Sequence, residues 1–499
     1  MNAALNRMRI PRLRDAGIFT FALTLLLCLS ASSCAVNPVT GNSDFVTMTE
    51  AQEIALGREA HPKVIAQYGQ YENPELQAYV QKVGAGVAAH SHRSNLIYRF
   101  TVLNSTEVNA FALPGGYVYI TRGLLAYLNT EAELAAVLGH EIGHVTARHA
   151  VRQQSAATVT GILGSVLAAG VGVQGTQDIV NVLGGAVLQG YGREHELEAD
   201  RLGAEYLARS GYDPHAMIEV IGILKDQEQF EVQQAKEEGR EPHVYHGVFA
   251  SHPDNDQRLQ EVVGAANKFR NAGALRVNRE GFLHEIDGLT FGDSARDGIR
   301  RGNHFYHADL GFAVDFPAGW KLDNQLSAVL AMAPHGQAVL QLTSEDINER
   351  VSPREFMRVR LKIDALRDGE AIDNPDMPGY TGITDGNSPF GKRPVRVTVL
   401  YFNNKAFIFY GAAKSADQPY AFDRDFVASA KTFHAITPQE RTLAREQKIH
   451  LLQVRGALRI EDVAAKSPIS DHALEQLRLI NALYPQGEPR PGQWLKVVE

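Results

Sequence analysis

Two histidines and a glutamate in the stretch LGHEIGHVTARHA, residues 138–150, have the types and spacing of a metal-dependent hydrolase site. His140 and His144 are four positions apart, so on a helix their side chains face the same way. Neutral imidazole is a good zinc ligand. Glu141 lies one residue round the helix, where its carboxylate could take a proton from a water on the metal. The alternative is a polar pair on an ordinary amphipathic helix.

A zinc hydrolase also needs a third protein ligand and one open position for water. The stretch REHELEADRLGAEYLA, on a helix predicted over 193–210, contains Glu196 and Asp200 four residues apart. We expect Glu196 to bind zinc and Asp200 to accept the outer N–H of a ligand histidine. Glu198 and His195 are expected to point elsewhere. An exposed acidic helix face is the alternative for the whole group.

The helix that carries the two histidines has a clear start in the sequence. Thr130, followed by acidic residues in the first turn, is typical of a helix N-terminus, and the helical pattern continues to about residue 154. Gly139 and Gly143 flank the ligands, where bulk would block close packing or the approach of a substrate. Thr49 predicts a second N-cap, with Gln52 among the nearby acceptors.

The chain around these helices divides into several regions. Strands are predicted over 97–104 and 117–125, before the histidine helix. A charge-free stretch over 156–175 follows that helix and is expected to be a covering helix or lid. Contact of this stretch with a membrane surface is the alternative. Residues 273–302 lack clear periodicity and are interpreted as a linker. An α+β domain is predicted over 303–436, including a hairpin about Asn403 and Asn404. Residues 445–499 follow the order strand, helix, helix, strand.

The N-terminus predicts a secretory signal. Four arginines up to Arg14 precede an uncharged run over 16–30, and the small-residue exit ASSC ends at Cys34. The run is shorter than the roughly twenty residues of a comfortable membrane span, and an uncleaved anchor is the alternative. ASSC resembles the box of bacterial lipoproteins, which implies a lipidated Cys34 after a signal peptide over 1–33 and a tether over 34–48. Ala35, rather than Asp, implies the outer membrane.

Four motifs occur in one order: NAFALPGGYVYITRGLL, LGHEIGHVTARHA, EHELEADRLG and SHPDNDQRL. Together they resemble the zinc metallopeptidases that include HtpX, the CAAX prenyl protease and the periplasmic BepA-type proteases, over residues 49–272. The resemblance implies one zinc ion per chain, held by His140, His144 and Glu196, with Glu141 as the catalytic base. It also implies that His252 is a removable fourth ligand or an oxyanion contact, with Arg258 as a supporting residue close by.

The first of these motifs resembles the substrate-binding edge strand of the same family. Such a strand would pair with extended peptide backbone and require little sequence specificity, although a simple hairpin turn is the alternative. The residues concerned are Asn109, Ala110, Phe111, Ala112, Leu113 and Pro114.

The two C-terminal regions carry weaker resemblances. The 303–436 region is similar to PsbP-like α+β domains and contains no cluster of ligands. The 445–499 region resembles a LysM-like βααβ module, which implies peptidoglycan binding. GALR stands where that family has a Gly-Asp-Thr start, so a packing or docking domain is the alternative.

The expected fold class is therefore α+β: a mainly helical zincin-type peptidase domain with a small edge-strand sheet, an α+β domain and a LysM-like module. The chain is 44% hydrophobic and 21% charged with a net charge of −8, and no Lys/Arg-rich stripe suggests nucleic acid. The expected function is a lipid-anchored periplasmic zinc endopeptidase that degrades misfolded or stalled outer-membrane proteins, in contact with the outer-membrane assembly machinery. A chaperone-like assembly factor or scaffold with a latent peptidase site is the alternative.

Overall fold

The computed structural model describes residues 34–46, 48–155, 191–238, 242, 261, 262, 264, 268, 275–325, 327–372, 374 and 376–499. The expected signal peptide, the 156–175 segment, His252 and Arg258 lie outside these residues. Two N-terminal strands, β1 (Cys34–Val36) and β2 (Ser43–Phe45), pair antiparallel within the segment predicted as a tether.

The helices of the described part follow the sequence in this order: α2 (Glu50–Tyr68), α3 (Pro74–Ala88), α4 (Arg122–Tyr127), α5 (Glu131–Thr146), α8 (Arg193–Arg209), α9 (Ala216–Glu238), α11 (Arg279–Glu285), the short 3-10 helix η1 (Pro334–Gly336), α12 (Pro353–Val359), α13 (Asp423–Lys431), α14 (Pro438–Leu443), α15 (Ile460–Ala464) and α16 (Ala473–Ile480).

The remaining strands are β3 (Arg99–Leu103), β4 (Ala110–Leu113), β5 (Tyr117–Thr121), β6 (Thr290–Phe291), β7 (Ile299–Arg301), β8 (His304–His307), β9 (Phe312–Asp315), β10 (Lys321–Gln325), β11 (Ala328–Met332), β12 (Ala338–Asp346), β13 (Arg367–Ile372), β14 (Gly379–Ser388), β15 (Gly391–Phe402), β16 (Lys405–Ala413), β17 (His434–Ala435), β18 (Gln447–Gln453) and β19 (Trp494–Val498).

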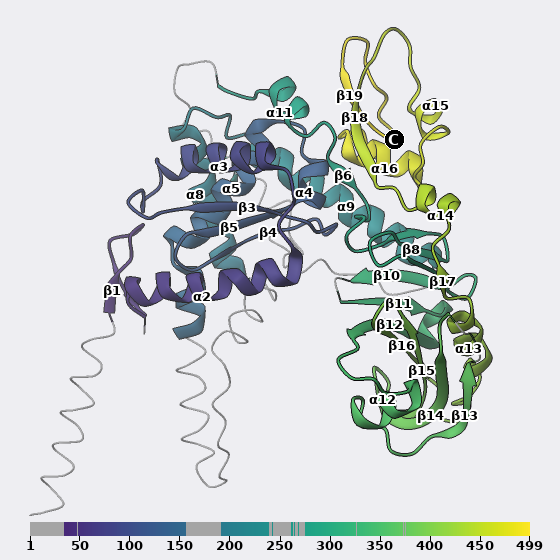
Figure 1. Cartoon of the computed structure of the whole chain (residues 1–499). Helices are drawn as coiled ribbons and strands as arrows, with labels where there is room; N and C mark the ends of the chain where they lie inside the picture. The colour runs from purple at the N-terminus through teal and green to yellow at the C-terminus, as the bar shows by residue number, and fades with distance from the viewer. Residues whose placement is uncertain are drawn as a thin grey trace, which may run out of the picture.

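Helix α5 is the centre of the N-terminal lobe, and every one of its residues is buried (Figure 1). The Thr130 hydroxyl caps it by accepting from the backbone N–H of Glu133, as the sequence predicts. A three-stranded sheet in the order β3-β5-β4 packs beside it, with β3 parallel and β4 antiparallel to β5. The predicted strand over 117–125 is wrong beyond residue 121, because the Thr121 hydroxyl caps α4 by accepting from Leu124 N–H.

Helices α5 and α8 approach closely because glycines line their contact. A Cβ at Gly143 would lie 2.9 Å from the carbonyl oxygen of Ala199, and one at Gly203 would lie 3.0 Å from the backbone nitrogen of His140. Real Cβ atoms essentially never come closer than 3.0 Å to another atom, and a contact at 3.0 Å is tighter than nine in ten real Cβ contacts. Small residues thus bring the two predicted ligand helices together at the level of His140 and His144.

The prediction of one helix continuing to about residue 154 is wrong. Helix α5 ends at Thr146, and Arg148 adopts φ 57°, the left-handed region that a non-glycine residue seldom occupies. Its guanidinium holds the turn by donating to Glu53 Oε2 at 3.0 Å and to the carbonyl oxygen of Met48 at 2.9 Å. A new helical stretch then begins at His149 and is described to residue 155.

The middle lobe contains a seven-stranded antiparallel sheet in the order β10-β11-β12-β16-β15-β14-β13 and a four-stranded sheet in the order β17-β9-β8-β7. The hairpin predicted about Asn403 and Asn404 is confirmed: β15 ends and β16 begins on either side of them, and both have positive φ.

The C-terminal segment has the predicted order of strand, helix, helix and strand, β18-α15-α16-β19. It shares one hydrophobic core with the N-terminal lobe, to which it contributes Ile449, Leu477 and Leu495. The buried Lys496 ammonium donates to the carbonyl oxygens of Ala126 and Leu128, at 2.7 and 2.8 Å. The yellow C-terminal elements therefore lie against the lobe that contains α5 (Figure 1).

The segment predicted as a linker also contributes to this core. It contains α11 and β6, and the side chains of Phe282, Leu283 and Leu289 are buried with those of α5. Strand β6 pairs with β18, which joins the segment to the C-terminal module. The buried Arg122 guanidinium donates to the carbonyl oxygen of Thr290 at 3.0 Å.

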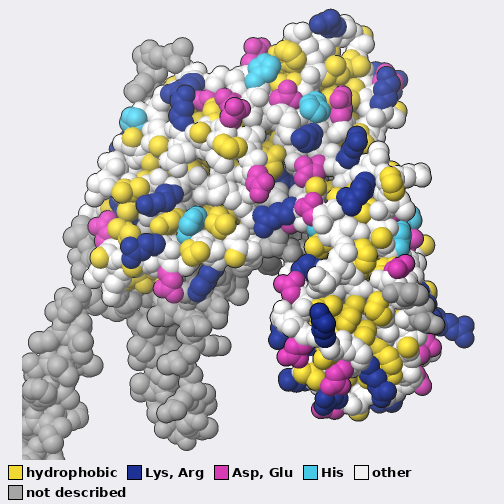
Figure 2. Space-filling model, viewed as in Figure 1, with side chains coloured by type: hydrophobic (Ala, Val, Ile, Leu, Met, Phe, Trp, Pro, Cys, Tyr) yellow, Lys and Arg dark blue, Asp and Glu magenta, His cyan; other side chains and the backbone are white. Residues whose placement is uncertain are grey.

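The visible face of the molecule has acidic and basic side chains spread over both lobes, with hydrophobic side chains gathered on the lower part of the middle lobe (Figure 2).

None of the helices in the described ranges combines the length and apolar character that crossing a bilayer requires.

Candidate metal centre

Helices α5 and α8 bring three predicted ligands together. His140, His144 and Glu196 are buried, and one ligand atom from each lies within 4.8 Å of the others. The Nε2 atoms of the two imidazoles are 2.9 Å apart. The carboxylate oxygens of Glu196 lie 3.5 Å from Nε2 of His140 and 3.7 Å from Nε2 of His144. The three donors thus surround one point.

This donor set fits zinc. Tetrahedral zinc with bonds of about 2.0–2.1 Å places neighbouring ligand atoms roughly 3.3 Å apart, and the observed separations of 2.9, 3.5 and 3.7 Å bracket that spacing. Two imidazoles and a carboxylate are also the donors of many catalytic zinc sites. The cluster is buried, so a divalent cation there would compensate the buried carboxylates.

Asp200 contacts the outer nitrogen of the first ligand. Its Oδ1 lies 2.8 Å from Nδ1 of His140, and both side chains are buried. Burial alone would lower the pKa of His140, but hydrogen bonds to Asp200 and Glu196 outweigh it and raise the pKa to about 9. The two carboxylates therefore favour positive charge at this ring. With Nδ1 protonated and donating to Asp200, Nε2 is the atom that faces the other ligands.

Glu141 has the features of a residue kept for proton transfer. Its Oε1 is buried and has no hydrogen-bond partner within the described residues. Burial raises the pKa of Glu141 to about 8, although the charge of His140 acts in the opposite direction. A buried carboxylate oxygen without a partner is costly, so it is expected where a ligand or substrate supplies the partner.

The second ligand, His144, has neighbours that the sequence analysis did not single out. Its Nδ1 lies 2.8 Å from Nδ1 of His149, and the Tyr191 ring stacks on it with centroids 4.2 Å apart. Nε2 of His149 lies 3.0 Å from Oε2 of Glu198. The expectation that Glu198 and His195 point elsewhere is thus wrong in part: Glu198 reaches His144 through His149, and the His195 ring stacks on His149 at 4.4 Å.

The surroundings of His149 and Glu198 determine the charges of these two side chains. Burial lowers the pKa of His149 to about 4, so the ring is neutral at pH 7. The hydrogen bond from His149 and then that from Arg152 hold the pKa of Glu198 at about 2. In the sequence His149 is five residues after His144 and Glu198 two after Glu196, and this nearness alone does not predict a contact. The expectation of one continuous helix placed His149 on the wrong face.

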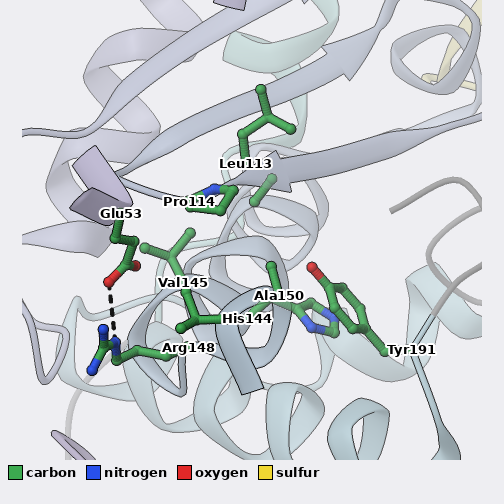
Figure 3. Close-up of a pocket in the computed structure, with 10 residues that line it drawn as sticks. Glu53, Leu113, Pro114, His144, Val145, Arg148, Ala150 and Tyr191 are labelled. Carbon is green, nitrogen blue, oxygen red and sulfur yellow. Dashed lines mark hydrogen bonds and ion pairs between the residues drawn. The ribbon is translucent and has the colours of Figure 1, made fainter. Parts of the chain in front are cut away.

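A pocket lies beside the second ligand (Figure 3). Leu113 and Pro114, at the end of β4, face the chain segment of His144, and Tyr191 closes one side. Among the described strands, β4 pairs with β5 alone, so its other edge is unpaired. The structure therefore places the predicted edge strand, which includes Ala110, Phe111 and Ala112, next to the metal ligands. Asn109 precedes the strand and pairs through its backbone with Thr121.

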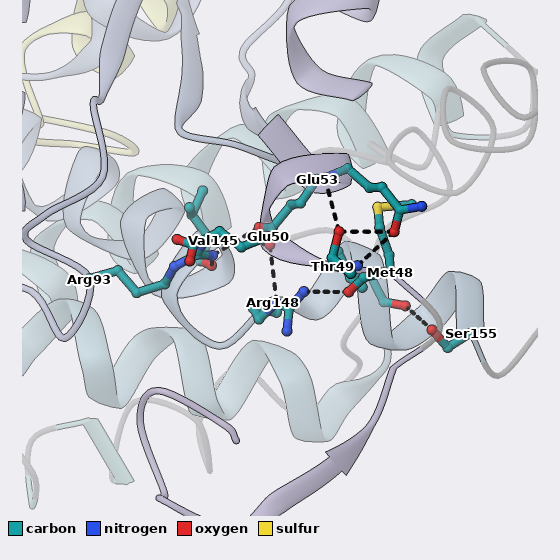
Figure 4. Close-up of polar contacts among 10 residues, drawn as sticks. Met48, Thr49, Glu50, Glu53, Arg93, Val145, Arg148 and Ser155 are labelled. Atoms are coloured by element: carbon teal, nitrogen blue, oxygen red, sulfur yellow. Dashed lines mark hydrogen bonds and ion pairs between the residues drawn. The ribbon is translucent and has the colours of Figure 1, made fainter. Parts of the chain in front are cut away.

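An ion-pair network connects the pocket-lining residues Val145 and Arg148 to α2 (Figure 4). The Glu53 carboxylate, buried on α2, accepts from Arg93 at 2.8 Å and from Arg148 at 3.0 Å. Arg93 also donates to the carbonyl oxygen of Val145, in the last turn of α5, at 3.1 Å. Helix α2 is thus connected to the end of helix α5.

A buried His-Glu-x-x-His helix joined to a distant glutamate defines the metallopeptidase class. Residues 74–266 match the family model described as Peptidase family M48, a segment that includes all three ligands. This segment of the chain is thus similar to the peptidases of family M48.

Relatives of this kind include the beta-barrel assembly-enhancing protease of Escherichia coli, which is 33% identical over 250 residues, 48% of this chain and 49% of that protein. The mitochondrial metalloendopeptidase OMA1 of Arabidopsis thaliana is 38% identical over 140 residues, 28% of each chain. The chain thus spans about half the length of the first relative and less of the second.

The solution structure of a cyanobacterial PsbP from Synechocystis matches 29% of this chain and 98% of its own chain, with a TM-score of 0.22 and 16% identity. The PsbP-like character of the middle lobe stays a prediction at that level of similarity, and so does the LysM-like character of the last module.

Proposed function

We propose that this protein is a zinc-dependent endopeptidase. The single observation that carries the proposal is the convergence of His140, His144 and Glu196 within 4.8 Å of one another, with Glu141 beside them. When bound there, zinc supplies a Lewis acid that activates water and polarises a carbonyl group.

The protein's own residues account for the remaining steps. Glu141, whose buried oxygen lacks a partner in the described part of the chain, takes a proton from the attacking water and passes it to the leaving amine. The edge of β4 that pairs with none of the described strands can bind a peptide as an added strand, through backbone hydrogen bonds that do not depend on sequence. Unfolded polypeptides are the substrate class that such an edge selects.

Cleavage of casein by the purified protein tests this proposal. Replacing Glu141 with glutamine removes the base and keeps the side-chain shape, so we expect at least a ~100-fold lower rate with zinc content unchanged. Glu194→Gln, an exposed position of the same acidic helix, is the matched control and is expected to retain wild-type activity. Wild-type activity in Glu141→Gln would refute the catalytic assignment.

The proposed site of action is the bacterial envelope. The signal-like N-terminus and the relatives named beta-barrel assembly-enhancing protease support a lipid anchor at Cys34, an outer-membrane location and misfolded or stalled outer-membrane proteins as substrates. Replacing Cys34 with serine should release the protein from the membrane fraction. Membrane association that persists in Cys34→Ser would favour an uncleaved anchor.

His252 and Arg258 complete the proposed catalytic residues, on the basis of the sequence motif alone. If His252 acts as a removable fourth ligand, His252→Ala should raise casein cleavage. If it contacts the oxyanion, the same variant should lower it.

An assembly function that does not require cleavage is the second candidate. It is favoured by the C-terminal module, which lies outside the family match and shares the core of the peptidase lobe. Support of outer-membrane protein assembly by Glu141→Gln, in cells that lack the wild-type protein, would show this function directly.

A further inference from the structure

The second metal ligand is held by a series of side chains that differs from the support of the first. His140 has a carboxylate, Asp200, directly on Nδ1. His144 has instead a second imidazole on Nδ1, that of His149, which is itself buried. Glu198 completes the chain at the far nitrogen of His149, and Arg152 pairs with the same carboxylate oxygen at 2.9 Å.

The proton positions along this chain follow from the metal site. If Nε2 of His144 binds a cation, its proton must be on Nδ1, which makes Nδ1 a donor. The facing Nδ1 of His149, 2.8 Å away, must then be an acceptor. The only proton of a neutral His149 is therefore on Nε2, where it donates to the Glu198 carboxylate at 3.0 Å. Each donor in the series meets an acceptor.

We propose that His149 and Glu198 are positioning residues that orient the His144 imidazole and fix its tautomer for the metal. This inference rests on the proposed zinc site. Outer hydrogen bonds of this kind hold ligand rings and raise their basicity. The break at Arg148 is what brings His149 under His144, because residues five apart on a continuous helix face different directions. Stacking of His195 on His149 at 4.4 Å further restricts the ring.

The test is zinc affinity of the purified full chain, measured by competition with a chelator. We expect His149→Leu, which removes the acceptor, to lower the affinity about 10- to 100-fold. His149→Asn should recover part of this loss, because its side-chain oxygen can still accept from Nδ1 of His144. Glu198→Ala should also lower the affinity, whereas the exposed Glu194→Ala is the matched control and should not.

The double variant distinguishes one connected series of hydrogen bonds from two independent contributions to zinc affinity. If Glu198 acts on the metal site through His149, adding Glu198→Ala to His149→Leu should cause little further loss of zinc affinity. If the two losses of zinc affinity multiply in the double variant, the proposal is overturned. Single variants that bind zinc as tightly as the wild type would also overturn it. If the wild type itself binds no zinc, the proposed function fails and not merely this inference.

A measurement on the wild type keeps the proposal testable if these variants do not fold. Nitrogen-15 NMR of the zinc-loaded protein should show His149 neutral and protonated at Nε2, with a protected Nδ1–H on His144. A His149 ring protonated at Nδ1, or at both nitrogens, would overturn the proposal.

Discussion

The backbones of Gly143 and Ala199 are in direct contact, since a Cβ at position 143 would lie 2.9 Å from the Ala199 carbonyl oxygen. Gly143 precedes the ligand His144, and Ala199 precedes Asp200. Together with the contact of Gly203 with His140, this contact sets how closely the two halves of the metal centre approach.

Gly143→Ala should separate α5 from α8. We expect the free energy of unfolding to fall by about 1–3 kcal/mol, as for other overpacked interiors, and zinc affinity to fall with it, measured by urea denaturation and chelator competition. Gly86→Ala is the control, because no atom lies within 4 Å of a Cβ there. It should be neutral or slightly stabilising. Unchanged zinc affinity in Gly143→Ala would contradict the packing argument.

Removing a ligand and removing its support should have different effects on metal binding. Glu196→Ala is expected to abolish stoichiometric zinc, because only two of the three donors in the described part of the chain remain. Asp200→Asn should keep the ion but weaken its binding about 10- to 100-fold, since the amide supports His140 without a charge. Metal analysis of the purified variants distinguishes the two. Full zinc in Glu196→Ala would remove the third-ligand assignment.

Glu131 connects the start of α5 to three other segments. Its carboxylate accepts from Tyr79 at 2.8 Å, from Tyr212 at 2.6 Å and from Asn278 at 2.6 Å. Burial would raise the pKa of Glu131, but these hydrogen bonds outweigh it and hold the pKa below its ordinary value.

The contribution of Glu131 to stability should accordingly depend on pH. A group whose pKa is lower in the folded state stabilises the fold above its unfolded pKa of about 4.3, and this contribution is lost as the pH falls through the folded value. Glu131→Gln should therefore be less stable than the wild type at pH 7, and the difference should narrow in acid. Urea denaturation at pH 7 and below pH 4 measures the difference in unfolding free energy between the two proteins. A difference that does not change with pH would disprove the lowered pKa of Glu131.

Lys496 links the last strand to the segment before α5. Lys496→Met leaves the buried carbonyl oxygens of Ala126 and Leu128 without their donor, so we expect a loss of about 1–3 kcal/mol in the free energy of unfolding. Lys448→Met, at an exposed position of the neighbouring strand, is the control and should change it by less than about 0.5 kcal/mol. Casein cleavage at a temperature where Lys496→Met begins to unfold should fall in parallel. Equal stability of the two variants would mean that the C-terminal module does not support the peptidase lobe.

The sequence by itself determined the features that depend on neighbours in the chain. The four-residue spacing of His140 and His144 requires only a helix, and Thr130 marks where that helix starts. The hairpin at Asn403 and Asn404 likewise needs only two residues that tolerate positive φ. Local spacing and backbone preference are sufficient for such features, because no distant partner is involved.

Only the tertiary structure decided how distant segments meet. The left-handed turn at Arg148 is held by Glu53, on a helix far earlier in the chain, so no pattern around residue 148 predicts the break that brings His149 beneath His144. The segment predicted as a linker joins the core because β18 and Arg122 supply its hydrogen bonds. Such contacts form by packing between segments that are far apart in the sequence. No short stretch of sequence is therefore sufficient to predict them.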